Sequence, residues 1–471
     1  MDTEKILSYC NQIDILTQKI REEIIIAPPE PPEPTDETLV PAGGDLQAAM
    51  DEGGNLRLAE GATFTKSDGY LFNTPQTAVR GSGNVISSDS SNGGFRLPVG
   101  ARGCTLEHLT VKAPKNEVAV QIGKNDSNQT TVEQAPAEVT VTQVTVMGHR
   151  GKRAIECNGN GVVFTDCDIR DVYDPEKADS QAIWIGNSPG DVTIKGGHFE
   201  AASENIMVGG DKMKIPNCRP TNILIEDATF TKPLTWKGNT AIPTKNLIEL
   251  KDGHNVHLRR LILFHSWASG QDGYGFMFTP KNGGSLRNVL VEGCEMSEVG
   301  AIVNITGHDF TADNASSLPR TQVEFRGGTY RTNKVAMGGP GRFCLITEGP
   351  ERVVFTGLTI EHEGSSFLEV GDKDACDVIH VCDSEWNYGS YGIRIGGYNH
   401  GDNALGIVKE LKIEGNTIRG AHSQFKSRYP DNTYIDSMSY EREREVDRKD
   451  VIAAMEREVA EELKRLKQWL K

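Results

Sequence analysis

The sequence predicts an all-β solenoid: a right-handed parallel β-helix with three short strands per coil, flanked by α-helical segments at both ends. Two observations predict it. A strand–corner–strand phrase recurs eleven times between residues 104 and 411, a mean step of about 31 residues, and periods of roughly 20–50 residues indicate a repeat architecture. A third short strand falls between successive copies, and no helical periodicity separates them.

Each copy of the phrase is an alternating strand, a two-residue corner and a second alternating strand. In one copy, Val192 and Ile194 alternate with polar residues, Gly196 lies in the corner, and Phe199 is the apolar centre of the second strand. Strict alternation predicts one buried face for each strand. The first apolar residues of the copies are Cys104, Val139, Val162, Val192, Ile223, Val256, Val289, Val323, Val353, Ile379 and Leu411.

The third strands complete the coil. They are expected at residues 182–186, 205–209, 247–250, 275–278, 367–370 and 392–396. Three strands per turn, stacked turn on turn, allow each backbone to pair with the coils on either side while the apolar faces fill the tube. A propeller would need four longer strands per blade, and a leucine-rich repeat would need a denser leucine pattern. The steps of 23–35 residues between copies predict corner loops of different lengths, where functional surface is expected.

Three asparagines open successive copies. Asn222, Asn255 and Asn288 are spaced at identical 33-residue steps. Stacked in one column, they would satisfy one another's amide groups along the helix axis. The alternative is the ordinary preference of asparagine for turns.

Composition excludes several classes of partner. The net charge of −16 argues against nucleic acid, because no basic stripe is present to displace counterions. No apolar run approaches the roughly 18 residues that span a bilayer, so no membrane partner is expected. The nine cysteines are odd in number and form no Cys-x-x-Cys pair, which predicts reduced core residues. We expect no metal site and no cofactor.

The two ends differ from the middle. Residues 1–26 are expected to form an anchoring helix, with Ile6, Ile13, Leu16 and Ile20 on an a/d-like stripe. A proline-rich linker follows at 27–38, then the β-helix at 39–436, whose open end is expected to be capped by a short helix near 43–50. No apolar signal sequence opens the chain, so synthesis in a cytoplasm is expected.

Residues 437–471 predict a charged amphipathic helix. Its apolar stripe has an eleven-residue repeat, which favours a straight or slightly right-handed association. We interpret it as a self-association segment, with a homotrimer expected; the alternative is a helix lying on its own β-helix. The stripe comprises Ile452, Met455, Val459, Leu463, Leu466 and Leu470.

Catalytic motifs are weak. Polygalacturonase-like glycosidases carry an adjacent Asp pair that this sequence lacks, and only fragments of two other motifs are found, at Gly307–Asp309 and Arg394–Gly396. Acids on neighbouring coils would lie about 5 Å apart, the spacing of retaining glycosidases. Glu249, Asp272 and Glu369 are the catalytic candidates. The alternative is that they occupy ordinary outward positions.

Two aromatic residues lie near these acids. Trp267 and Tyr274 are candidates for stacking on a sugar ring. The alternative is that they pack over the coil below.

Residues 247–282 resemble a segment of uncharacterised bacterial and phage right-handed β-helix repeat proteins. The match rests on Glu249–Asp252, on Trp267 in a turn, and on Phe278–Asn282. With the terminal segments, it suggests a pectate-lyase-like β-helix of the phage tailspike, head-fibre or capsid-decoration kind. Such a virion protein would attach to a capsid or tail protein through residues 1–34 and bind host surface polysaccharide. The alternative is a polysaccharide depolymerase, either glycoside hydrolase or lyase.

Overall fold

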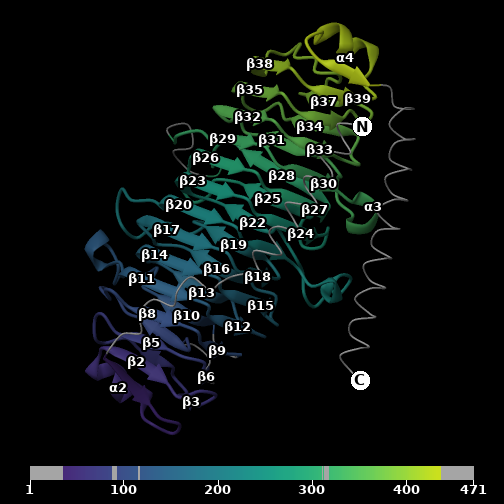
Figure 1. Cartoon of the computed structure of the whole chain (residues 1–471). Coiled ribbons are helices and arrows are strands. Elements are labelled where there is room, and N and C mark those ends of the chain that lie inside the picture. The colour runs from purple at the N-terminus through teal and green to yellow at the C-terminus, as the bar shows by residue number, and fades with distance from the viewer. Residues whose placement is uncertain (1–35, 87–92, 115–116, 310, 312–317, 436–471) are drawn as a thin grey trace, which may run out of the picture. The chain divides into compact units, whose positions relative to one another are not determined.

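The computed structural model describes residues 36–86, 93–114, 117–309, 311 and 318–435. The terminal segments expected to be helical, with Ile6, Ile13, Leu16 and Ile20 at one end and the stripe from Ile452 to Leu470 at the other, lie outside these residues. Within them the chain forms a right-handed parallel β-helix, as predicted. Three long parallel sheets run along it, and between residues 55 and 419 successive strands of the chain enter the first, second and third sheet in turn (Figure 1).

The first sheet carries the opening strand of each repeated phrase. Its strands are β1 (Glu37–Val40), β2 (Asn55–Leu58), β5 (Ala78–Arg80), β8 (Thr105–Glu107), β11 (Ala137–Thr142), β14 (Asn160–Thr165), β17 (Gly190–Lys195), β20 (Thr221–Glu226), β23 (Gly253–Arg259), β26 (Leu286–Glu292), β29 (Gln322–Arg326), β32 (Arg352–Thr356), β35 (Cys376–Cys382) and β38 (Val408–Glu414).

The second sheet carries the strand that follows the two-residue corner. Its strands are β3 (Thr63–Thr65), β6 (Asn84–Ile86), β9 (Thr110–Lys112), β12 (Thr145–Met147), β15 (Asp168–Val172), β18 (His198–Ala201), β21 (Thr229–Thr231), β24 (Ile262–Ser266), β27 (Glu295–Val299), β30 (Thr329–Thr332), β33 (Thr359–Glu361), β36 (Glu385–Asn387), β39 (Thr417–Arg419) and β40 (Thr433–Ile435).

The third sheet completes each coil. Its strands are β4 (Tyr70–Leu71), β7 (Phe95–Leu97), β10 (Val118–Ile122), β13 (Arg153–Cys157), β16 (Gln181–Ile185), β19 (Glu204–Val208), β22 (Ile248–Leu250), β25 (Tyr274–Phe278), β28 (Ala301–Thr306), β31 (Cys344–Thr347), β34 (Ser366–Val370) and β37 (Gly392–Ile395).

The register is the one that the repeated phrase predicted. Val139 pairs with Val162, Val162 with Val192, and Val192 with Ile223. The same column continues to Leu411 on the last coil of the first sheet. A one-residue slip would turn every apolar side chain outward, so the buried face fixes the pairing. The inward side chains of all three sheets form one continuous core.

From β8 onward, a two-residue corner between the first and second sheets is built the same way on each coil. Its first residue has a positive φ, as at Asp166 (48°), Gly196 (65°) and Asp227 (56°). This left-handed conformation suits Gly, Asn and Asp. The second corner residue points into the core, and this is where Cys167 and Cys294 are buried. All described cysteines are free thiols.

The asparagine ladder is confirmed. Asn288 donates to Asn255 Oδ1 at 3.0 Å, Asn255 donates to Asn222 Oδ1 at 3.1 Å, and Asn222 donates to Asp191 Oδ1 at 2.8 Å. All four residues have φ between 51° and 56°. Turn preference and ladder formation therefore act at the same positions.

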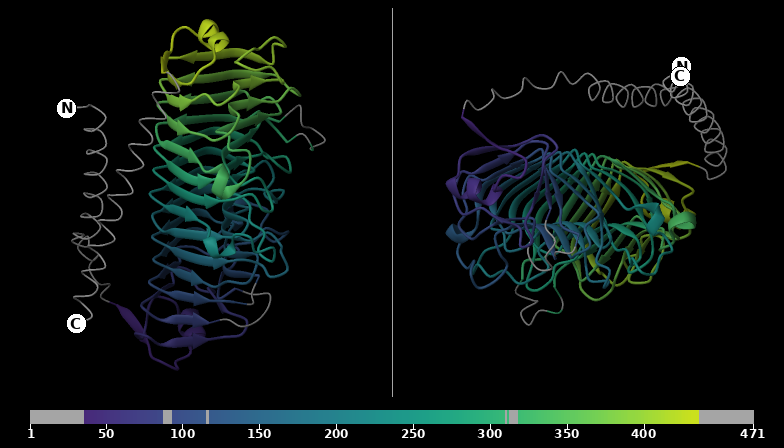
Figure 2. Two further views of the ribbon diagram at one scale, coloured as in Figure 1. Left: turned by 90° about the vertical axis from the view of Figure 1, so that its right-hand side faces the viewer. Right: turned by 90° about the horizontal axis from the view of Figure 1, so that it is seen from below.

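Short helices lie at the two ends of the described stack (Figures 1 and 2). The predicted N-terminal helix is α2 (Leu46–Glu52), capped by Asp45 and buried through Leu46 and Met50. At the other end α4 (Ser423–Arg428) buries Phe425. The remaining helices lie in corner loops: α3 (Lys334–Met337) and the 3-10 turns η1 (Val132–Gln134) and η2 (Leu234–Trp236). No described helix is long and apolar enough to cross a membrane.

Candidate functional site

The outer face of the third sheet carries charged and amide side chains together with a few apolar ones. The central outward residue of each strand stacks on the one before it, forming a column that we name the outer row. It runs Gln121, Glu156, Trp184, Met207, Glu249, Met277, Asn304, Leu345, Glu369 and Arg394. On most coils, long loops connect this sheet to its neighbours, so the row lies between two sets of loops.

The three candidate carboxylates do not come together. Glu249 and Glu369 share the outer row but are four coils apart, about 19 Å at the usual strand spacing. Glu369 is held between Arg342 and Arg394. Asp272 is exposed in the loop before β25. Glu249 and Glu369 occupy similar positions in the repeat, which favoured a shared groove. Too many coils separate them for the two carboxylates to act as a catalytic pair.

The two candidate sugar-stacking aromatics are buried, so the stacking hypothesis is wrong for both. Trp267 is 2% exposed and packs with Trp236 and Met337 in a small core beneath the loops. Tyr274 is also 2% exposed and packs with Met277 of the same strand and Ala301 of the next coil. Neither presents a ring face, because each fills the space under a corner loop. The packing alternative describes both residues.

A polar pocket of about 260 Å³ lies at the N-terminal part of the outer row. Its floor is the outer face of β10, β13 and β16, and its wall comes from the loops after β10 and β19. The lining residues from the strands are Gln121, Arg153, Glu156 and Trp184, and those from the loops are Lys124, Asn125, Asp126 and Asp211.

Arg153 is the central side chain of the pocket. Its guanidinium lies 3.7 Å above the centre of the Trp184 ring and donates to Glu156 Oε2 at 3.1 Å. Trp184 in turn donates its indole N–H to Gly209 O at 2.7 Å. The Arg153 plane is therefore held from two directions. The ring of Trp184 is covered and 1% exposed, so the pocket is lined by polar atoms.

Two buried acids, Glu204 and Glu249, lie next to this pocket. Arg153, Gln181 and Glu204 follow one another on successive coils in a second column. Glu204 accepts from Gln181 Nε2 at 2.8 Å and lies 3.8 Å from Lys245 Nζ. Burial, with Glu249 nearby, raises the pKa of Glu204 to about 8. Glu204 therefore keeps its proton at neutral pH.

Glu249 lies one coil further on and is surrounded by donors. Its carboxylate accepts from Thr279 Oγ1 at 3.3 Å and Asn246 Nδ2 at 3.4 Å, and Lys251 Nζ lies 3.4 Å away. Two carboxyl groups on neighbouring coils, of which Glu204 has a raised pKa, resemble the acid and base of a glycosidase. However, Glu204 is 0% and Glu249 3% exposed.

Beneath this pair, Lys232 is completely buried. Its ammonium donates to the backbone oxygens of Ala201, Ala202 and Ser203 at 2.7–3.1 Å and to Asn205 Oδ1 at 3.1 Å. Burial lowers the pKa of Lys232 to about 7. The lysine therefore serves the turn before β19, because its protons satisfy backbone oxygens at the end of β18 and in that turn.

Sequence reasoning missed Glu204, Arg153 and Glu156. Glu204 is the first residue of β19, one residue before the strand expected from the apolar residues at 205–209, and Arg153 and Glu156 lie in a strand that the sequence analysis did not identify. A charged residue at the start of a strand is also common on ordinary surfaces. These residues could have been found from their alignment in the repeat, because Arg153, Gln181 and Glu204 occupy the same position on successive coils.

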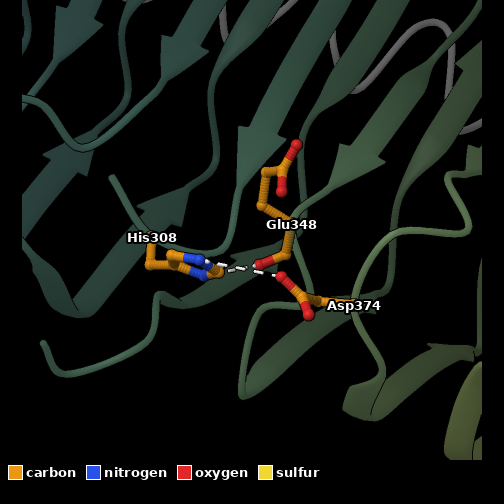
Figure 3. Close-up of side chains that lie close together, drawn as sticks. All are labelled: His308, Glu348 and Asp374. Atoms are coloured by element: carbon orange, nitrogen blue, oxygen red, sulfur yellow. Dashed lines mark hydrogen bonds and ion pairs between the residues drawn. The ribbon is translucent and has the colours of Figure 1, made fainter. Parts of the chain in front are cut away.

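A separate group of possible metal ligands lies at the corner between the third and first sheets. Potential ligand atoms of His308, Glu348 and Asp374 lie within 4.8 Å of one another (Figure 3). His308 Nδ1 donates to the backbone oxygen of Glu348 at 3.0 Å, and Nε2 lies 3.7 Å from Asp374. The Glu348 carboxylate accepts from Lys373 at 2.9 Å, and this ammonium would repel a cation. The arrangement is an ion-paired corner.

No family profile and no curated sequence matches the chain. Among solved structures, it is similar to a mutant tailspike protein of E. coli bacteriophage HK620 in complex with a pentasaccharide, with 12% identity, TM-score 0.51 and coverage of 83% of this chain and 74% of that chain. This similarity shows the parallel β-helix fold.

Two further structures are similar over comparable lengths. The catalytic domain of a GH87 α-1,3-glucanase in complex with tetrasaccharides has 11% identity and TM-score 0.48, covering 86% of this chain and 68% of that chain. The A-module of the Azotobacter vinelandii mannuronan C-5 epimerase AlgE6 has 14% identity and TM-score 0.48, covering 79% and 93%.

Proposed function

We propose that this chain is a phage virion protein of the tailspike kind that binds host surface polysaccharide on the outer face of its third sheet. The observation that carries the proposal is the polar pocket around Arg153. Specific small-ligand sites are concave and contain a few fixed polar groups. Arg153, Glu156 and Asn125 are each held in place by protein partners, so they can orient hydroxyl or amide groups without first being ordered.

Burial favours binding over catalysis at this face. A hydrolase must bring an acid within hydrogen-bond distance of the glycosidic oxygen. Glu204 and Glu249 lie beneath neighbouring side chains, so a sugar reaches them only after those side chains move. The pocket, in contrast, is open in the structure as it stands.

The test is glycan binding by the full-length chain. We expect binding to lipopolysaccharide or capsular polysaccharide of the host on an array of bacterial glycans. Arg153→Gln should weaken it about tenfold or more, because a fixed charged hydrogen bond is worth about 1.5–3 kcal/mol. Arg331→Gln, an exposed arginine on the second sheet, is the matched control and should bind normally. A silent array, or equal binding by both variants, would contradict the proposal.

The second candidate is a polysaccharide depolymerase, favoured by the raised pKa of Glu204 beside Glu249. Release of reducing ends from a bound polysaccharide would be lost in both Glu204→Gln and Glu249→Gln and kept in Glu295→Gln, an exposed acid on the second sheet. An unsaturated product would indicate a lyase. Binding without cleavage in the wild-type chain would leave the binding proposal alone.

The virion part of the proposal is supported by the ends of the sequence. The apolar stripes at residues 6–20 and 452–470 predict a docking segment and a self-association segment, and residues 1–34 would contact a capsid or tail protein. A homotrimer is the expected assembly. Backbone pairing along the whole stack also suits a particle outside the cell, because such structures unfold slowly.

A further inference from the structure

A lysine and an asparagine from successive coils meet inside the corner between the second and third sheets. Lys232 follows β21, and Asn205 is the second residue of β19 on the preceding coil. Both side chains are completely buried, and Lys232 is the one lysine in the described part of the chain that is. Lys232 Nζ lies 3.1 Å from Asn205 Oδ1, and the amide carbon is at most about 1.2 Å farther away. A primary amine and a carboxamide therefore face each other where solvent does not reach.

Both groups are held in position by the surrounding backbone. The lysine amine donates to three successive backbone oxygens at the end of β18 and in the turn before β19, at 2.7–3.1 Å. The amide nitrogen of Asn205 donates to the backbone oxygens of Phe199 at 2.5 Å and Thr231 at 2.7 Å. Holding two groups together in this way replaces a collision between free molecules, and effective molarities of well-aligned groups reach about 10⁵–10⁸ M. The fold therefore supplies the proximity that an amine needs to attack an unactivated amide.

The protonation states also favour a reaction. An amine must lose its extra proton before it can act as a nucleophile, and desolvation promotes that loss. Burial lowers the pKa of Lys232 to about 7, and the nearby cation of Lys245 acts in the same direction. The acid that acts on Lys232 is Glu204, whose own pKa is raised by burial to about 8. At neutral pH this carboxyl group is mostly protonated, so it offers the ammonium no opposite charge.

We propose that Lys232 and Asn205 form an intramolecular isopeptide bond. Nζ attacks Cγ of the asparagine, the bond from Cγ to Nδ2 breaks, and the proton that Nζ loses leaves with Nδ2 as ammonia. No oxidant, cofactor or second reactant is consumed. The product is a secondary amide that joins two successive coils, and its N–H can still donate to the backbone oxygens before β19. Because both side chains are buried, water does not compete with the amine.

The bond would add a covalent tie at the start of a long corner loop. Lys232 is the first residue of the loop 232–247 between β21 and β22. In the same loop, Trp236 and Ile242 pack with Trp267 in the small core described above. A bond at the first residue would fix this loop to the preceding coil and slow its opening, which suits a protein whose stability is kinetic. The proposal goes beyond polysaccharide binding and does not depend on it.

Mass spectrometry of the full-length wild-type chain tests the bond directly. We expect the intact protein to be lighter than its sequence mass by one molecule of ammonia. Digestion of the unfolded protein should give a branched fragment that joins the segments containing Asn205 and Lys232, and fragmentation should place the bond at these two side chains. Because this measurement uses the wild-type chain, its result does not depend on whether a variant folds.

Variants test the two residues. Asn205→Ala and Lys232→Arg each remove one reactant, so both should have their full sequence mass and give no branched fragment. Lys237→Arg changes an exposed lysine of the same loop. It is the matched control and should keep both the loss of ammonia and the branched fragment. Circular dichroism identifies the variants that fold.

The outcomes either support the bond or remove it. A wild-type chain with its full sequence mass and separate fragments would overturn the proposal, and Lys232 would then be an ammonium held by four acceptors. A loss of ammonia that maps to other residues, or that persists in Asn205→Ala or Lys232→Arg, would overturn it as well. None of these results bears on polysaccharide binding, which the glycan array measures separately.

Discussion

Replacing Asn255 tests the asparagine ladder and its backbone conformation together. Asn255 donates to Asn222 and accepts from Asn288, and its φ is 53°. Asn255→Ala removes both hydrogen bonds, each worth about 0.5–1.5 kcal/mol. It also places alanine in the left-handed region, at a cost of about 1–2 kcal/mol. The sum is about 2–5 kcal/mol.

Asn255→Gly is the matched control. It removes the same hydrogen bonds, but glycine adopts the left-handed conformation without steric cost. We therefore expect the glycine variant to lose only about 1–3 kcal/mol. The difference between the two variants isolates the cost of the positive φ.

The assay is the rate of unfolding in guanidinium, followed by tryptophan fluorescence, because a long β-helix is characterised better by its unfolding rate than by an equilibrium. Where coil pairing is lost before the transition state, each 1.4 kcal/mol accelerates unfolding about tenfold. The expected order is wild type, then glycine, then alanine. Equal rates for the two variants would refute the backbone argument, and wild-type rates in both would refute the ladder.

Three other predictions follow from the buried acid and from the ends of the chain. The pKa of Glu204 is raised to about 8 in the folded protein, against 4.5 in the unfolded chain. Between these two pH values the folded state binds one proton more than the unfolded state. The stabilisation that comes from this proton is therefore fully present below pH 4.5 and is lost as the pH rises through 8. The Tm of Glu204→Gln should accordingly fall less between pH 5 and 8 than that of the wild type, and an identical fall would contradict the assignment. A chain ending near Tyr440 should be monomeric by light scattering if the C-terminal stripe holds a trimer, whereas a trimer in the shortened chain would remove that role. Deleting residues 1–34 should free the protein from purified virions, and continued incorporation would refute anchoring through this segment.

The sequence determined the fold because the information was local and repeated. The repeated phrase aligns Val162, Val192 and Ile223 in the sequence, and each of them pairs with the next across the first sheet. The two-residue corner has a constant length, so an apolar position early in the chain predicted the register of every later coil. The asparagine ladder was predictable for the same reason, because equal spacing becomes vertical stacking.

The site was harder to predict because it depends on how many coils separate two residues. Glu249 and Glu369 occupy equivalent repeat positions, but three strands lie between them. The neighbour of Glu249 is Glu204 on the adjacent paired strand β19, and the loops that separate these strands in the chain have lengths that follow no rule in the sequence. For Trp267 the sequence left sugar stacking and packing as alternatives, since an aromatic residue in a loop is either exposed or buried according to whether another loop covers it.

The uneven loops beside the third sheet have a consequence for redesign. The two-residue corner holds the coils in register, while the other corners change length from coil to coil. Doubling the length of a flexible loop costs only about 0.6 kcal/mol of closure entropy. Each wall of the pocket is therefore an exchangeable part: the segment after β10 that carries Asn125 could be transplanted or lengthened while the strands beneath it stay as they are. A library varied only in those segments would sample new ligand preferences on an unchanged scaffold.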